Sequence, residues 1–384
     1  MKIFKKKSLT ILVLNLVIAA SVFLFVKFIP FNERINWKIY DTIAKFAKNS
    51  TPLPAKAKDI LLVPIGNPTL KNIPFAWPYP RSVFARIIDN LAAAQAKVIA
   101  FDFIFLGESK ENEDAALRVS LERNKNVVLA QTISEEGTLG LSTRTDLAKN
   151  TASGVITKLQ DSDGVVRKNL TFLVDEDHSN SGYLSWEMRI LEFAENIKLS
   201  TLNLKGSTVS FRNEKFEKWS VPIWKDTGSF LIRFCANTAD FNRISFYQIY
   251  EGNFDRSLVK DKIVMIGFLS SLLADIHNTP LGFLPGITLN ANAFLSLYAK
   301  NFLREIPRLI QLLILFILVS LLALSSVLFK KRAAIFIVSL ELVLFFVFSY
   351  WLYLLGYIWN YFIVPFSLVV CFLINRKLPQ KYLD

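Results

Sequence analysis

Cysteine and histidine are scarce in this 384-residue chain, which contains two of each. Cys371 lies inside a long apolar run and Cys235 in the middle of the chain, so a disulfide scaffold is excluded. His178 and His277 have no Cys or His partner at ligand spacing, which argues against a zinc site. The Gly-x-Ser-x-Gly nucleophile motif and the Gly-Lys-Ser/Thr phosphate loop are also missing. We therefore expect no enzymatic activity, no cofactor and no metal ion.

Charge is sparse and uneven. Charged residues make up 20% of the chain, against about 25% in soluble domains, and hydrophobic residues make up 52%. Residues 31–305 carry a net charge of +3, whereas the two ends together carry +10. The apolar blocks at both ends exclude a purely soluble protein. The basic residues flank these blocks, so they indicate membrane topology rather than binding to nucleic acid.

Four apolar runs predict membrane-spanning helices. They cover residues 8–29, 309–329, 333–354 and 358–374. At about 1.5 Å per residue, the first run reaches about 33 Å, enough to cross a hydrocarbon core of about 30 Å. A signal peptide usually has an apolar region of about 7–15 residues, so an uncleaved anchor is favoured. Cleavage near the Ala19–Ser21 stretch is the alternative.

Basic and aromatic flanks set the expected orientation across the lipid bilayer. Ten Lys and Arg residues fall before the first run, between the second and third runs, or after the fourth. The connection between the third and fourth runs instead carries aromatic residues, as expected at a membrane interface. We therefore expect cytoplasmic tails at residues 1–7 and 375–384 and an outside domain at residues 31–305.

One carboxylate, Glu341, lies inside the third apolar run. An ionisable group within a membrane span is a candidate for function. The alternative, which we favour, is a protonated side chain that is hydrogen-bonded to Asn15 or Ser325 on a neighbouring helix. The sequence offers no second intramembrane charge as a relay partner and no inverted repeat, so transport is not expected.

The outside domain alternates predicted strands and helices. Strands are expected at 60–65, 98–103, 126–130 and 262–267, and helices at 81–94, 114–123 and 287–299. Weaker patterns predict strands at 170–174, 209–212 and 230–234, a helix at 184–193, and an irregular stretch at 268–285. This order predicts an α/β domain with a largely parallel sheet and flanking helices, beside four transmembrane α-helices.

Six short strings, in order over about residues 35–300, resemble the type-two CHASE domain (cyclases/histidine kinases associated sensory extracellular). The residues that carry the resemblance are Trp77, Pro78, Pro80 and Arg81; Asp102; Asp163, Gly164 and Arg167; Gly267; Asp275, Thr279 and Pro280; and Gly286, Asn290 and Asn292. The three apolar runs at the end of the chain are also usual in this family. Each string alone is weak, but their order makes the resemblance specific.

The resemblance implies a receptor in a bacterial inner membrane. Family members sense an unidentified extracytoplasmic signal, pass it to a cytoplasmic kinase or cyclase, and are expected to form dimers. Only about ten residues follow the fourth run, so we expect a separate protein to supply the output. Gly66 stands where the family usually has an acidic residue, which puts one ligand or ion contact in doubt.

Three residues are candidate ligand contacts. Asp102 lies at the end of a predicted strand, where open α/β sheets bind ligands, and it could bind a cation or an amine; the alternative is a turn cap. Arg81 begins a predicted helix and could bind an anion; the alternative is a structural pair with Asp102. Asp275 lies near His277 and could act with it as a base, although no nucleophile motif accompanies them.

The Asp161–Arg167 string superficially resembles a calcium loop. It lacks the spaced oxygen ligands and the final Glu of an EF-hand. We expect a turn with Gly164 at positive φ, held by Arg167. The leading interpretation of the whole chain is thus a receptor subunit, and the alternative is an envelope assembly protein whose outside domain is a docking module.

Overall fold

The computed structural model describes residues 2–28, 31–132, 151–174, 182–224, 227–269 and 275–377. His178 and the end of the expected C-terminal tail, residues 378–384, lie outside these ranges. Contacts divide the chain into two units. We call Met1–Ser50 with Leu303–Asp384 the helical unit, and Thr51–Phe302 the α/β unit. Residues 31–50, which the sequence analysis assigns to the outside domain, belong to the helical unit.

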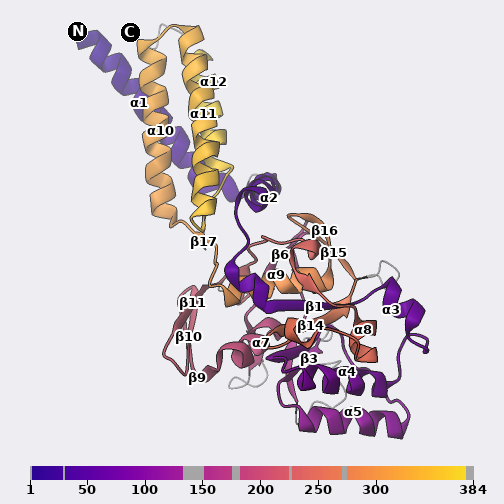
Figure 1. The fold of residues 1–384 in the computed structure, drawn as a ribbon. Helices are drawn as coiled ribbons and strands as arrows, with labels where there is room; N and C mark the ends of the chain where they lie inside the picture. The colour runs from indigo at the N-terminus through magenta and orange to yellow at the C-terminus, as the bar shows by residue number, and fades with distance from the viewer. Residues whose placement is uncertain are drawn as a thin grey trace. The chain divides into compact units, whose positions relative to one another are not determined.

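A six-stranded sheet forms the centre of the α/β unit (Figure 1). Its order is β13 (Asn242–Arg243), β1 (Ile60–Ile65), β14 (Ile263–Phe268), β2 (Val98–Phe101), β3 (Val127–Gln131) and β4 (Ala152–Val155). All five neighbouring pairs are parallel, so the largely parallel sheet is confirmed. The carboxyl ends of these strands consequently lie along one edge of the sheet.

Helices cover both faces of this sheet (Figure 1). Side chains along a strand point alternately to the two faces, so successive residues of a strand pack in two different hydrophobic cores. Leu61 of β1 packs in the same core as Phe84, and the next residue, Leu62, in the core that contains Trp186. The helices are α3 (Asn67–Asn72), α4 (Arg81–Ala93), α5 (Glu111–Arg123), α7 (Trp186–Glu195), α8 (Phe246–Glu251) and α9 (Gly286–Tyr298). Two apolar faces on each central strand explain its continuous apolar sequence.

Short antiparallel strands make up much of the rest of the unit. They are β5 (Leu159–Gln160), β6 (Val166–Leu170), β7 (Phe172–Val174), β8 (Gly182–Leu184), β9 (Ile197–Lys205), β10 (Thr208–Asn213), β11 (Lys218–Pro222), β12 (Ser229–Leu231), β15 (Ile276–Thr279) and β16 (Gly282–Pro285). The expected single strand at 170–174 is wrong, because the chain changes pairing at Thr171 between β6 and β7. The stretch 268–285 is not wholly irregular, since β15 and β16 form a hairpin.

Among the described residues of the helical unit, two helical segments are long and apolar enough to cross a membrane. These segments are Arg308–Ser326, with mean hydropathy 2.6, and Arg332–Leu354, with mean hydropathy 2.3. The unit's helices are α1 (Lys2–Phe25), α2 (Asn32–Ser50), α10 (Arg308–Leu328), α11 (Lys331–Leu354) and α12 (Ile363–Lys377). The apolar part of α1 is shorter, and α12 begins five residues later than the expected fourth span. Its 15 residues cover about 22 Å.

The expected hydrogen bond from Glu341 to Asn15 or Ser325 is wrong. Within the described part of the chain, both polar side-chain atoms of Asn15 are buried without a hydrogen-bond partner, as is Glu341 Oε2. The Ser325 hydroxyl donates to the Leu322 carbonyl of its own helix, at 2.8 Å. A hydroxyl inside an apolar helix finds a backbone carbonyl one turn back more easily than a partner on another helix.

Candidate functional site

A cavity of about 530 Å³ opens at the carboxyl edge of the parallel sheet. Asp102 follows β2, Thr132 follows β3, Thr157 and Lys158 follow β4, and Phe268 ends β14. Asp275, His277 and Asn290 complete the polar lining. Four parallel strands therefore end at this cavity, which is where the sequence analysis expects a ligand crevice.

Asp102 has one satisfied and one unsatisfied carboxylate oxygen. Its Oδ1 accepts a hydrogen bond from the Asn290 amide at 2.7 Å, whereas Oδ2 is buried and has no partner among the described residues. The Asn290 Oδ1 is likewise buried without a donor. Burial, and then the nearby Asp275 carboxylate, raise the pKa of Asp102 well above its usual value. The raised pKa favours the protonated carboxyl group, whereas an ionised Asp102 presents, together with Asn290 Oδ1, two buried acceptors that lack donors.

Asp275 and His277 lie together, as their spacing predicts. The His277 Nε2 and Asp275 Oδ1 atoms are 3.0 Å apart, and both residues line the cavity. The Asp275 carbonyl accepts the backbone N–H of Gly286 at 3.0 Å, which fixes the residue beside the start of α9. Among the described residues, no group of three His, Cys, Asp or Glu side chains could hold a metal ion.

Two glycines allow the carboxylates to take these positions. A Cβ atom at Gly267 would lie 2.9 Å from Asp102 Cβ and 3.1 Å from Ile287 Cβ. A Cβ atom at Gly286 would overlap the carboxylate of Asp275. Neither glycine has positive φ, so both are required for space rather than for backbone conformation.

A buried ion pair beneath the cavity was missed by the sequence analysis. The Lys158 ammonium, which lines the cavity, lies 2.6 Å from Glu187 of α7. The Glu187 side chain is fully buried and also accepts a hydrogen bond from Asn169 at 2.9 Å. Lys158 and Glu187 are 29 residues apart and on separate elements, so no spacing rule links them.

The family model of the CHASE2 domain matches residues 15–325. The chain belongs to the CHASE2 domain family. No curated protein and no solved structure matches the chain. The match confirms the resemblance to the type-two CHASE domain, and this family consists of extracellular sensory domains. Membership of this family therefore supports a sensory role for the chain.

Arg81 occupies a different part of the CHASE2 domain from Asp102. Its guanidinium lies 2.9 Å from Asp114 of α5 and donates to the Leu106 and Gly107 carbonyls. The expected pair of Arg81 with Asp102 is therefore wrong. The reason is that α4 packs beside α5 on one face of the sheet, which brings the buried Asp114 carboxylate to the start of α4.

Arg81 instead lines a second cavity, of about 540 Å³. Trp77, Pro78 and Pro80 also line this cavity, and the Trp77–Pro78 peptide bond is cis. Its lining combines aromatic side chains with the charged Glu108, Lys110 and Glu113, and Trp77 contacts Phe268 edge-on at 5.0 Å between ring centroids. Phe268 and the segment after β2 line both cavities. The three candidate ligand residues thus divide into Asp102 with Asp275 and, separately, Arg81.

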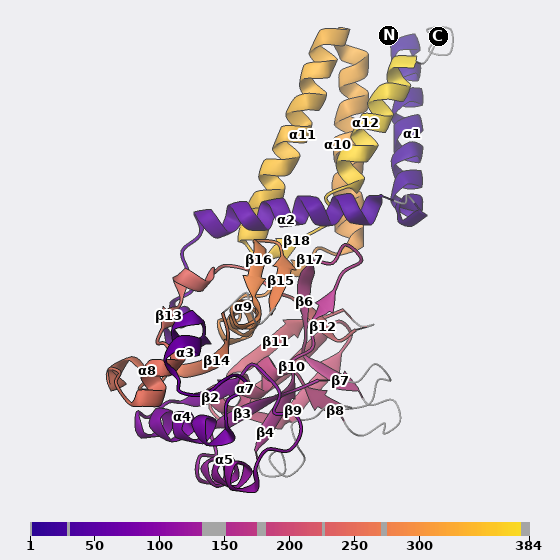
Figure 2. The ribbon, with the colours of Figure 1, turned by 90° about the vertical axis from the view of Figure 1, so that its right-hand side faces the viewer.

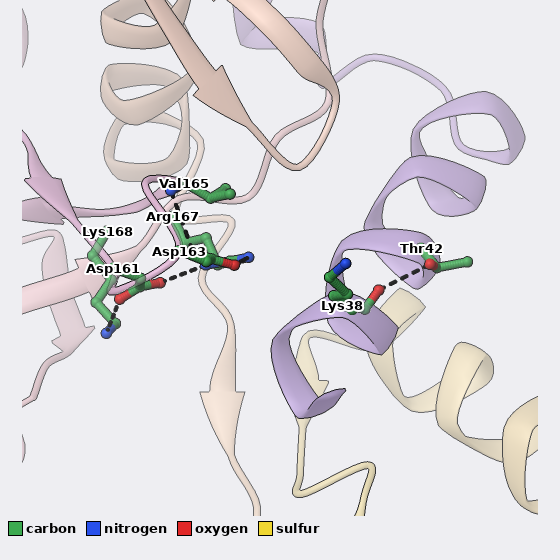
Figure 3. A network of polar contacts seen from close by, with 7 residues as sticks. All are labelled: Lys38, Thr42, Asp161, Asp163, Val165, Arg167 and Lys168. Atoms are coloured by element: carbon green, nitrogen blue, oxygen red, sulfur yellow. Dashed lines mark hydrogen bonds and ion pairs between the residues drawn. The ribbon is translucent and has the colours of Figure 1, made fainter. Parts of the chain in front are cut away.

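The Asp161–Arg167 string forms the expected turn (Figure 3). Gly164 has φ +75°, and the fully buried Arg167 donates to Asp161 at 2.9 Å and to both oxygens of Asp163 at 2.9 and 2.8 Å. The hydrogen bonds from Arg167 lower the pKa of Asp163. Arg167 therefore holds the turn as predicted. The carboxylates of Asp161 and Asp163 are hydrogen-bonded to Arg167 and stabilise this turn.

Three further motif residues, Thr279, Pro280 and Asn292, have structural roles. The Thr279 hydroxyl donates to the Gly282 carbonyl at 2.7 Å, and Pro280 lies in the same β15–β16 turn. The Asn292 amide accepts the backbone N–H groups of Cys235 and Ala236, both at 3.0 Å, and so fixes the segment after β12 against α9. Asn290 differs from them because it lines the cavity.

Gly66 lies at the sheet's carboxyl edge, immediately after β1. Its φ of −126° is open to any residue, and an added Cβ atom would meet only Pro68 Cδ, at 3.9 Å. The structure therefore has room for the acidic side chain that the family usually carries here. The glycine is not explained by packing.

Proposed function

We propose that this chain is a membrane-anchored receptor subunit that binds a small donor-rich ligand, most simply an amine, in the cavity at the sheet's carboxyl edge. The ligand signal passes through the helical unit, in the inner membrane of a bacterium, to a separately encoded output protein. The chain itself performs no catalysis in this proposal. Its helices α1, α10, α11 and α12 all span the membrane, with residues 31–305 outside and both termini in the cytoplasm.

The unsatisfied acceptors in the cavity carry the proposal. A buried acceptor without a donor costs about 1–3 kcal/mol, so Asp102 Oδ2 and Asn290 Oδ1 favour an occupant with N–H or O–H groups. Asp275 adds a second carboxylate to the lining, whereas the Lys158 ammonium is paired with Glu187. A ligand ammonium group would supply the missing donors, and its positive charge would keep Asp102 ionised by lowering the raised pKa of that carboxyl group.

Substitution of Asp275 tests the ligand class. We expect at least one member of a panel of small amines and polyols to raise the thermal midpoint of the full chain in detergent. A ligand at 100 times its Kd stabilises by about 2.7 kcal/mol. The rise should disappear in Asp275→Asn and persist in the control Asp255→Asn, whose exposed carboxylate lies outside the cavity. Equal responses from the two variants would place binding elsewhere.

Co-purification tests the output step. The tagged chain, extracted from its native cell in mild detergent, should carry a cytoplasmic kinase, cyclase or regulator in stoichiometric amount, as identified by mass spectrometry. Extracytoplasmic or cell-wall proteins alone would contradict the receptor proposal. They would favour the alternative in which the outside domain is a docking module for envelope assembly. Cross-linking before extraction would report whether the chain forms the expected homodimer.

A further inference from the structure

Helix α2 is amphipathic, although the sequence analysis did not predict it. One stripe of the helix is charged and consists of Arg34, Lys38, Asp41, Lys45 and Lys48. Their spacing of three and four residues places them on one face. A neighbouring face carries apolar side chains that remain exposed, including Ile35 (37% exposed) and Phe46 (64% exposed). These exposed apolar side chains favour contact with an apolar partner outside the described contacts of the helix.

Contacts within the helical unit place α2 across one end of the other helices (Figure 2). Asn36 Oδ1 accepts the backbone N–H of Tyr361 at 2.7 Å. The ring of Tyr40 lies 5.9 Å from that of Tyr353 at the end of α11. Tyr353 and Tyr361 belong to the aromatic connection that the sequence assigns to a membrane interface. The helix therefore lies at the interfacial level of the proposed spans, as amphipathic surface helices do.

A groove of about 720 Å³ runs between α2 and α11. Its apolar walls include Ile39 and Phe46 of α2 and Val347 of α11, and its polar atoms come from residues such as Lys38 and Thr42. The volume lies within the range of about 300–1,000 Å³ that is typical of ligand pockets. Val347 is 59% exposed and belongs to a helix apolar enough to cross a membrane, so the groove is continuous with the surface that would face lipid.

We propose that this groove binds an acyl chain of a membrane phospholipid, with the lipid phosphate paired to Lys38. The apolar walls match the acyl chain, and the ammonium at the groove's margin complements the negative phosphate. Both groove walls belong to one unit, so the site is complete within it. The inference rests on the membrane placement in the proposed function, but not on the ligand cavity.

Native mass spectrometry of the full chain, with added dioleoylphosphatidylglycerol, tests the site. Wild type should retain one lipid per chain at low lipid concentration. A basic residue near an anionic surface contributes about 1 kcal/mol, which corresponds to about fivefold in affinity. We expect Lys38→Glu to weaken retention at least about fivefold. Val347→Trp, which fills the groove from an exposed position, should abolish it.

The matched control is Lys45→Glu, which makes the same charge change on the same exposed stripe but outside the groove lining. It should weaken retention less than about twofold. Equal loss in Lys38→Glu and Lys45→Glu, or full retention in Val347→Trp, would overturn the proposal. A dimer that Val347→Trp dissociates would show that a second copy fills the groove instead.

Alkaline carbonate extraction of the wild-type membranes separates this inference from the proposed function. A chain that remains in the membrane pellet but retains no lipid contradicts only the groove. A chain that is released into the supernatant contradicts the membrane placement, and therefore both.

Discussion

Arg167→Ala is expected to lower the free energy of unfolding by about 3 kcal/mol. The guanidinium is fully buried and bonds both Asp161 and Asp163, so its removal leaves Asp163 without its counter-ion and Asp161 with Lys168 alone. Breaking one side of a buried pair typically costs about 3–5 kcal/mol, and the partial exposure of the carboxylates puts this case at the lower end. The thermal midpoint should fall by about 6–12 °C, measured by circular dichroism of the full chain in detergent.

Lys168→Ala is the control for Arg167→Ala. Its ammonium lies 2.8 Å from Asp161, but it remains partly exposed and forms the weaker side of the same network. We expect a loss of about 0–1 kcal/mol. A loss in Lys168→Ala as large as that in Arg167→Ala would contradict the account given of the turn.

The pH dependence of stability should show the contribution of Asp163 to the Arg167 network. The pKa of Asp163 is lowered in the folded protein, because Arg167 donates to its carboxylate. Its contribution to stability is therefore present above the unfolded pKa of about 3.9 and is lost as the pH falls through the lowered folded value. The difference in thermal midpoint between wild type and Arg167→Ala should thus narrow as the pH decreases below about 4.

Glu187→Ala is expected to have a similar or larger effect, about 3–5 kcal/mol. The carboxylate is fully buried, and its removal leaves the Lys158 ammonium, 6% exposed, without its partner at 2.6 Å. It also removes the acceptor for the Asn169 amide. The measurement is again the thermal midpoint in detergent, and the expected fall is about 6 °C or more.

Two further variants define the cause of the Glu187 effect. Glu195→Ala breaks a pair with Lys56 of nearly equal length, 2.7 Å, but Lys56 is 39% exposed, so the loss should stay within about 1 kcal/mol. The double variant Lys158→Met with Glu187→Met removes both charges and should recover much of the stability lost in Glu187→Ala. If the double variant recovers no stability, the loss in Glu187→Ala is caused by altered side-chain packing rather than by the unpaired Lys158 ammonium.

The parallel core could be predicted because its signals are local. Strand β1 is apolar over its whole length, and α4 has apolar residues at helical spacing, so both were placed within one residue. Strand β13 was missed because it has only two exposed residues and owes its place to pairing with β1. Pairing between distant segments leaves no periodicity in a two-residue stretch.

The candidate site could be predicted only in part, for the same reason. Asp102 was found because it lies at the end of a strong strand pattern. Thr132 and Lys158 line the same cavity but were not singled out. Lys158 follows β4, a strand that the sequence did not predict, and gains its position only when β3 and β4 pair in parallel. Arg81 was given the wrong partner because sequence order does not show that α5 packs beside α4 and brings Asp114 to it. Helix α2 was missed, because residues 31–50 were assigned to the outside domain without a predicted helix.

The helical unit is assembled from the two ends of the chain, with the α/β unit inserted between them. During synthesis, α1 and α2 therefore leave the ribosome about 250 residues before α10. At about 5–20 residues per second, α1 waits about 12–50 s for the helices that contact it. The α/β unit is complete before those helices exist, so the helical unit is the last part of the protein to assemble.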